Sequence, residues 1–183
     1  MSETGIIDAV QYLTFQLENE TYGMDIKQVR EVLEYSEVTR VPRMPDFMHG
    51  VINLRGGVLP VVDLRMKLGM TKTEKTVDTC IIIIELTIEG EKTILGAMAD
   101  SVKEVLTIEG DQIVPPPRMG TRLDTEFIKG MGKKNDEFII IIDIDKVFSF
   151  DEMAVLMDTG DEHLLRDPAG REPNETYLSE RNI

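Results

Sequence analysis

Few residues of this chain are of the types that carry out acid–base, nucleophilic or metal chemistry. The histidines are His49 and His163, and Cys80 is the single cysteine. Asp63 and Asp143 each follow two β-branched apolar residues, and a pair of carboxylates can do acid–base work. The two aspartates occupy equivalent positions of a repeated pattern. This favours another role, in which each carboxylate caps a turn at the end of its own strand.

The remaining candidates do not complete a reactive site. His163 is expected in solvent, and His49 in a turn that precedes Gly50. One cysteine with these neighbours cannot make a structural zinc site, and Cys80 begins an apolar run, as a buried small residue does. The sequence has no glycine-rich phosphate loop followed by Lys and Ser or Thr. We therefore expect no enzymatic activity, no metal and no cofactor.

The elements that must position these residues occur twice, in the same order. The matching blocks are GMDIKQVREVL at 23–33 and GAMADSVKEVL at 96–106, FMHG at 47–50 and FIKG at 127–130, and VVDL at 61–64 and IIDI at 141–144. The offset is 73 residues for the first pair and 80 for the other two, so one loop of the second copy is longer. A repeat of this length indicates a duplicated small domain.

Both copies consist mainly of short strand-like runs separated by Gly and Pro turns. Strands are expected at 11–17, 21–26, 37–41, 50–54, 58–64, 80–86, 92–99, 101–108 and 137–144. The helical spacing of Val29, Val32 and Leu33 predicts a short helix over 27–34. Pro60 predicts an edge strand or a bulge, because proline cannot donate to a β-ladder.

This pattern predicts an all-β fold with a few short helices, arranged as two small β-barrels. The folded domain is expected over residues 10–158. Its first barrel spans about 15–79, and its second spans about 80–150 and is completed by the N-terminal strand. A terminal helix is expected at about 150–158, and residues 159–183 are expected to form a disordered acidic tail.

Composition narrows the possible partners. The net charge of −14 repels phosphate backbones and anionic lipid, so neither nucleic acid nor a membrane surface is an expected partner. No apolar run approaches the roughly 18 residues of a membrane span, and the N-terminus lacks the basic and apolar regions of a secretion signal. We therefore expect a cytoplasmic protein that does not insert into the membrane.

Residues 22–69 closely resemble the CheW family of bacterial chemotaxis coupling proteins, most densely over GVINLRGGVLPVVDLR at 50–65. Further matching blocks follow in order: AMADSVKEVL at 97–106, IVPPP at 113–117, FIKGMG at 127–132 and DEMAVL at 151–156. The resemblance implies two intertwined, five-stranded, SH3-like barrels without enzymatic activity. It also implies an adaptor that couples the cytoplasmic tips of methyl-accepting chemoreceptors to the histidine kinase CheA, at membrane-associated receptor arrays.

The resemblance also implies two binding surfaces. The receptor-facing residues would be Ile26, Val29, Glu31, Val32, Arg55, Met98 and Asp100. The kinase-facing residues, which would contact the regulatory domain of the kinase, would be Val41, Pro42, Phe47, Gly50, Val58 and Leu59. Val29 and Val32 can instead be ordinary barrel core, and Arg55 a solvated hairpin charge.

Two other functions compete with this interpretation. The same kind of coupling protein could serve a non-flagellar chemosensory pathway, such as surface motility or development, and sequence alone does not separate the two. A small barrel enzyme or an oligonucleotide-binding barrel is the alternative from a different class. Aromatic residues make up 5% of the chain and Trp is absent, so the sequence offers no platform on which bases would stack.

Overall fold

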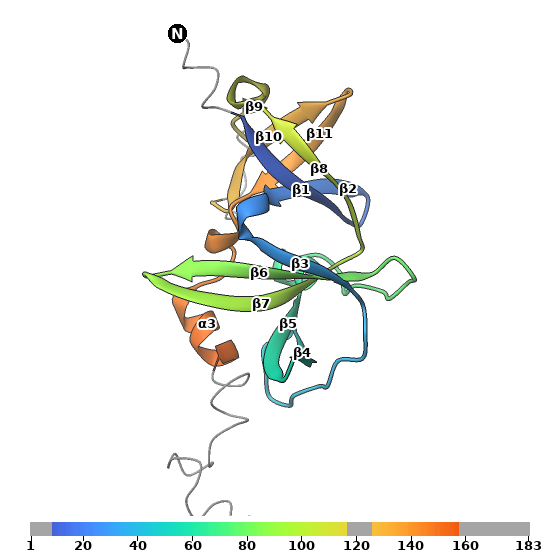
Figure 1. The fold of residues 1–183 in the computed structure, drawn as a ribbon, viewed down its shortest axis with the longest axis vertical. Coiled ribbons are helices and arrows are strands. Elements are labelled where there is room, and N and C mark those ends of the chain that lie inside the picture. Colours follow the sequence, from blue (N-terminus) through green and yellow to red (C-terminus); the bar gives the residue numbers. More distant parts are fainter. Residues whose placement is uncertain (1–8, 117–125, 158–183) are drawn as a thin grey trace, which may run out of the picture.

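The computed structural model describes residues 9–116 and 126–157, which are almost entirely β-structure. The strands form two curled sheets, a six-stranded sheet in the order β8-β1-β2-β11-β10-β9 and a five-stranded sheet in the order β3-β6-β7-β5-β4 (Figure 1). The expected all-β class is confirmed, and the sixth strand of the larger sheet is the two-residue β9. His163 and the expected tail at 159–183 lie outside the described residues.

The strands and helical turns have the following bounds. The six-stranded sheet contains β1 (Val10–Leu17), β2 (Glu20–Asp25), β8 (Ser101–Ile108), β9 (Ile113–Val114), β10 (Ile128–Lys134) and β11 (Glu137–Ile142). The five-stranded sheet contains β3 (Val29–Glu34), β4 (Met48–Leu54), β5 (Gly57–Asp63), β6 (Cys80–Ile88) and β7 (Glu91–Ala99). The helical elements are η1 (Ile26–Gln28), α2 (Leu64–Lys67), η2 (Gly110–Gln112), η3 (Ile144–Lys146) and α3 (Phe150–Met157).

The two copies of the repeat exchange their first hairpins. The hairpin β1–β2 of the first copy lies in one sheet with β8 to β11 of the second copy. The hairpin β6–β7 of the second copy lies in one sheet with β3 to β5 of the first. The sheets therefore do not divide the chain at residue 79. They are intertwined, and the chain crosses between them after β2 and again after β7.

Each exchanged hairpin joins its host sheet through a parallel pair of strands. Gly96 of β7 lies opposite Val61 of β5, and Gly23 of β2 lies opposite Ile141 of β11. These two pairs are repeat equivalents, because they are related by the sequence offsets of 73 and 80. The internal duplication is therefore also a duplication of structure.

The helix expected over 27–34 is wrong. Only η1 is helical there, and β3 follows it, paired antiparallel with β6 from Val29 opposite Ile84 to Glu34 opposite Cys80. The side chains of β3 alternate between half-buried and exposed, which is the period of a strand. Pairing with the buried β6 overrides the local spacing of the apolar residues.

Pro60 does not lie at an edge, since β5 has β7 on one side and β4 on the other. Pro60 lies opposite Val51, but Val51 exchanges both of its backbone hydrogen bonds with Thr39, at 2.8 and 2.9 Å. The parallel pairing of β5 with β7 begins one residue later, at Val61. A proline is tolerated because no ladder bond is required from its nitrogen.

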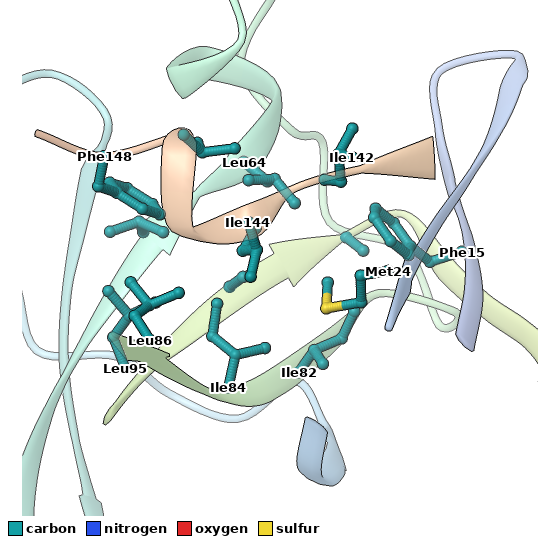
Figure 2. Packing of buried hydrophobic residues seen from close by; sticks show 14 of the residues in the cluster. Phe15, Met24, Leu64, Ile82, Ile84, Leu86, Leu95, Ile142, Ile144 and Phe148 are labelled. Atoms are coloured by element: carbon teal, nitrogen blue, oxygen red, sulfur yellow. The ribbon is translucent and has the colours of Figure 1, made fainter. Parts of the chain in front are cut away.

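The largest core cluster lies between the sheets and is shared by both. Phe15 and Met24 reach it from the six-stranded sheet, and Ile82 and Ile84 from the five-stranded sheet (Figure 2). Met153 and Leu156 of the terminal helix α3 are buried in the same cluster. Because both sheets bury side chains in one close-packed core, a change in their relative orientation would disrupt that packing and reduce stability.

Candidate docking surfaces

The two strand-end aspartates cap helical turns, as the repeat predicts. Asp63 accepts hydrogen bonds from the backbone N–H groups of Arg65 and Met66 at the start of α2, at 3.1 and 3.4 Å. Asp143 accepts from the backbone N–H of Asp145 in η3 at 3.2 Å. Each carboxylate serves its own copy of the repeat, so the arrangement provides N-caps and not an acid–base pair.

The other candidates for chemistry also have structural surroundings. His49 Nε2 lies 2.9 Å from the hydroxyl of Tyr35, and burial, followed by the charge of Arg40, lowers the pKa of His49. Burial raises the pKa of the Cys80 thiol, which makes its reactive thiolate less available. Within residues 9–116 and 126–157, no group of three or more His, Cys, Asp or Glu side chains is arranged to hold a metal ion.

Four of the expected receptor-facing residues lie together along η1 and β3. Ile26 and Val29 are half-buried and pack against the shared core, whereas Val32, opposite Ile82 on the same face of the sheet, is 39% exposed. Glu31 is on the same strand and forms an ion pair with Arg55 from the β4–β5 turn. The pair joins an edge strand to a hairpin at the surface of the five-stranded sheet.

A tight turn places Arg55 for this contact. Arg55 and Gly56 both have positive φ, at 50° and 88°, as the two central residues of a type I′ hairpin do. The side chain of Asn53 accepts a hydrogen bond from the Gly56 N–H at 3.1 Å. The hydrogen bond from Arg55 lowers the pKa of Glu31, and Glu31 raises the pKa of Arg55. The Arg55 side chain is 69% exposed, so its remaining donors face solvent.

The other two expected receptor-facing residues lie elsewhere. Met98 is 1% exposed in a core cluster with Ile52, Val61 and Ile81, so it cannot touch a partner without rearrangement. Asp100 lies at the crossover from β7 to β8 and is held by groups of this chain. The structure therefore brings four neighbouring residues and Arg55 together, but not these two.

A polar cluster holds Asp100 at the junction of the two sheets. Arg65 Nη1 donates to both carboxylate oxygens of Asp100, at 3.1 and 3.0 Å. The backbone N–H of Glu18 donates to Asp100 at 2.7 Å, and Arg65 Nη2 donates to the hydroxyl of Thr71 at 2.8 Å. Sequence reasoning missed the role of Arg65, although its position directly after the repeated VVDL block marks it.

The expected kinase-facing residues begin in the segment before β4. Val41 and Pro42 line a pocket of about 410 Å³. Its other walls come from the same segment and include two arginines and three apolar side chains. The full lining is Arg40, Val41, Pro42, Arg43, Met44, Pro45, Asp46 and Met48. The combination of apolar walls and cationic rim suits a partner segment that carries apolar and acidic residues.

Phe47 follows this pocket and packs against two side chains, Phe148 and Lys67, whose role sequence reasoning missed. Its ring lies 6.1 Å from the ring of Phe148, and the ammonium of Lys67 lies 5.4 Å from the Phe47 ring and 5.7 Å from the Phe148 ring. Lys67 also pairs with Glu152 of α3 at 3.4 Å. The terminal helix therefore fixes the position of Phe47.

The last three expected kinase-facing residues do not share one surface. Gly50 is buried, and Val58 packs against the shared core. Leu59, the next residue of β5, packs against a second cluster on the opposite face of the sheet. Only part of this set is therefore available to one partner.

Within the part of the chain that the structure describes, no helix is long and apolar enough to cross a membrane. Asp63 and Asp143 are engaged as caps, and the pocket at Val41 has mixed apolar and charged walls.

Comparisons with known proteins agree with this geometry. The family model of the CheW-like domain matches residues 11–152. A chemotaxis protein CheW of Klebsiella aerogenes is 36% identical over 153 residues, which cover 84% of this chain and 90% of that protein. A chemotaxis protein CheW of Bacillus subtilis is 34% identical over 136 residues, covering 74% of this chain and 84% of the relative.

A solved structure has a similar fold. The crystal structure of the scaffolding protein TtCheW from Thermoanaerobacter tengcongensis matches with a TM-score of 0.67 and 39% sequence identity. The match covers 78% of this chain and 94% of that one. The shared pattern therefore extends over nearly the whole of the relative.

Proposed function

Because the chain belongs to the CheW-like domain family, we propose that it is a non-catalytic adaptor that couples methyl-accepting chemoreceptors to a CheA-type histidine kinase. The observation that carries the proposal is the family match over residues 11–152, combined with the similarity to a scaffolding protein at 39% identity. The engaged aspartates and the two exposed surfaces of the five-stranded sheet support a binding role.

The proposed receptor surface is the edge formed by η1, β3 and the β4–β5 turn. Val32 offers exposed apolar area there, and the Glu31–Arg55 pair offers charge. A receptor helix that crosses the edge of β3 would meet Val32 on one face of the sheet and the exposed donors of Arg55, beside Glu31, on the other. Charges at the rim of such a contact contribute orientation and specificity more than affinity.

The proposed kinase surface is the pocket around Val41 and Pro42, together with the adjoining Phe47. Arg40 and Arg43 at the pocket would favour an acidic segment in the regulatory domain of the kinase. Lys67 and Phe148 keep the Phe47 ring in place, so little side-chain entropy is lost when a partner packs against it.

The experiment that tests the proposal is calorimetric titration of the protein into the regulatory domain of a CheA-type kinase from the same organism. We expect saturable 1:1 binding in about the micromolar range, roughly −8 kcal/mol. Val41→Asp should weaken this binding at least tenfold, because it adds an unpaired charge to an apolar wall. Val77→Asp is a matched control, since Val77 is 97% exposed outside the proposed surface. Absence of heat with every candidate kinase would contradict the proposal.

The receptor side is tested by a charge reversal. Arg55→Glu should reduce receptor control of kinase activity while the kinase affinity and the fold stay unchanged, because Arg55 lies on an exposed turn. The measurement is kinase activity in reconstituted receptor complexes with and without ligand. Lys133→Glu, at an exposed Lys on β10 that forms no ion pair with a described residue, provides the control for a change in charge alone. Normal receptor control by folded Arg55→Glu protein would count against this surface.

A further inference from the structure

A polar pocket of about 410 Å³ opens where the two sheets meet, apart from the proposed kinase surface and next to the η1 end of the proposed receptor surface. Its walls come from the end of β2 and η1, from the hairpin β6–β7, from β10 and from the turn η3 that follows β11. The lining residues are Asp25, Lys27, Gln28, Glu85, Thr87, Lys92, Lys129, Asp143 and Asp145. In the part of the chain that the structure describes, neither Lys27 nor Lys129 forms an ion pair.

Asp143, at this pocket, corresponds in the internal repeat to Asp63 of the first copy. The N–H of Asp63 donates to the carbonyl of Phe47, and the N–H of Asp143 donates to the carbonyl of Phe127, both at 2.7 Å. Each aspartate then caps the turn that follows it. Asp63 and Asp143 are therefore equivalent groups in equivalent backbone settings.

Their surroundings differ in one respect. At Asp63 the carboxylate also accepts from the N–H of Thr73 at 2.9 Å and from its hydroxyl at 2.7 Å, and Asp63 is left only 2% exposed. Among the described residues, Asp143 accepts only from the N–H of Asp145, and it stays half-buried at the pocket. A peptide segment thus fills the first position, whereas no described segment fills the second.

We propose that the pocket at Asp143 binds an extended peptide segment that presents a Ser or Thr hydroxyl next to an acidic residue, and that residues 158–183 of this chain supply it. In the first copy, the filling segment follows the helical turn after Asp63 in the chain. In the second copy, α3 follows the equivalent turn but buries Met153 and Leu156 in the core, so the next residues in order are 158–183.

The composition and length of this segment fit the pocket. Its hydroxyl residues Thr159, Thr176 and Ser179 each adjoin an acidic residue, as Thr73 adjoins Glu74. The hydroxyl and its N–H would bond to Asp143, and the neighbouring carboxylate would pair with Lys27 or Lys129. From 158 to 183 there are 26 residues, which at about 3.3 Å each span roughly 80 Å. This length exceeds the width of a domain of this size.

Paramagnetic broadening in the full-length chain tests the proposal. A nitroxide is attached through Ala169→Cys in a Cys80→Ser background, and the amide signals of Thr87, Lys129 and Asp145 are measured. We expect these three signals to lose most of their intensity selectively. Replacing the hydroxyls by Thr159→Val, Thr176→Val and Ser179→Ala in the same labelled chain should restore the intensity.

Two charge-reversal variants, one in the pocket and one outside it, distinguish binding in the pocket from random proximity of the spin label. Lys129→Glu should abolish the selective broadening, whereas Lys133→Glu should not, because Lys133 is exposed on the same strand but does not line the pocket. Broadening spread evenly over the surface, or none near the pocket, would overturn the proposal. Pocket signals that respond only to an added Thr-Glu peptide would overturn the assignment to residues 158–183 and indicate a partner's segment instead.

Discussion

At the scale of single residues, the Glu31–Arg55 pair predicts a specific dependence of stability on pH. The hydrogen bond from Arg55 lowers the pKa of Glu31 in the folded protein. A carboxyl whose folded pKa is depressed adds stability above its unfolded pKa of about 4.3, and that stability is lost as the pH falls through the lower folded value. Glu31→Gln should therefore cost stability at pH 7 and progressively less below about pH 4.3.

This prediction is checked by urea unfolding of both proteins between neutral and acidic pH. The two free energies of unfolding should converge toward acid. Glu34→Gln on the same strand provides the control, because Glu34 forms no ion pair with any described residue and should give a smaller difference. If the free energies of unfolding of Glu31→Gln and the unmodified protein still differ below the folded pKa of Glu31, the proposed role of the pair is contradicted.

Gly50 gives a second prediction at this scale. A Cβ atom at this position would lie 2.3 Å from the carbonyl oxygen of Thr39, which is backbone and cannot move aside cheaply. Gly50→Ala should therefore destabilise the protein by about 1–3 kcal/mol, as overpacking does. Gly57→Ala is the matched control, since the nearest atom to its Cβ, the oxygen of Leu54, is an ordinary 3.6 Å away. Equal urea midpoints for the two variants would refute the steric argument.

At the scale of elements, the repeat supplies an experiment within one chain. Asp63 accepts hydrogen bonds from α2 and from the segment that contains Thr73. Among the described residues, Asp143 accepts from η3 only. Asp63→Ala should cost about 1–3 kcal/mol because it leaves buried donors without an acceptor. Asp143→Ala should cost less, because among the described residues this half-buried carboxylate accepts from only one backbone N–H. Thermal unfolding of both variants measures these losses of stability. A larger loss of stability in Asp143→Ala than in Asp63→Ala would contradict the difference between the two sites.

At the scale of the whole molecule, the duplication, the all-β class and the terminal helix could be predicted from sequence. The caps at Asp63 and Asp143 could be predicted too, because the offset of 80 marks them as one local motif used twice. The N-terminal strand was expected in the second barrel, and the resemblance implied intertwined barrels, but the reciprocal transfer of β6–β7 could not be predicted, because nothing local in residues 80–99 specifies which sheet they join. The burial of Met98 could not be predicted from sequence either, since it depends on β7 lying between β6 and β5.

The exchange of hairpins has a consequence for unfolding. Each sheet contains a hairpin from the other copy, and one core cluster spans both sheets, so neither sheet can open while the other keeps its strands. We expect a single cooperative unit in which the slowest amides of both sheets exchange with the same free energy of opening. Ile82→Val should cost about 0.5–1.5 kcal/mol and lower protection equally in both sheets.

Native-state hydrogen exchange measures this directly, with amides of Phe15 and Ile141 reporting on the six-stranded sheet and those of Ile84 and Ala97 on the five-stranded sheet. Ile142→Val, in the six-stranded sheet and the same shared core cluster, is the reciprocal variant and should give the same uniform loss. Loss of protection confined to the five-stranded sheet in Ile82→Val would show that the sheets open independently. An adaptor that holds two partners at once gains from such coupling, because its two surfaces then keep one fixed geometry for as long as the core is intact.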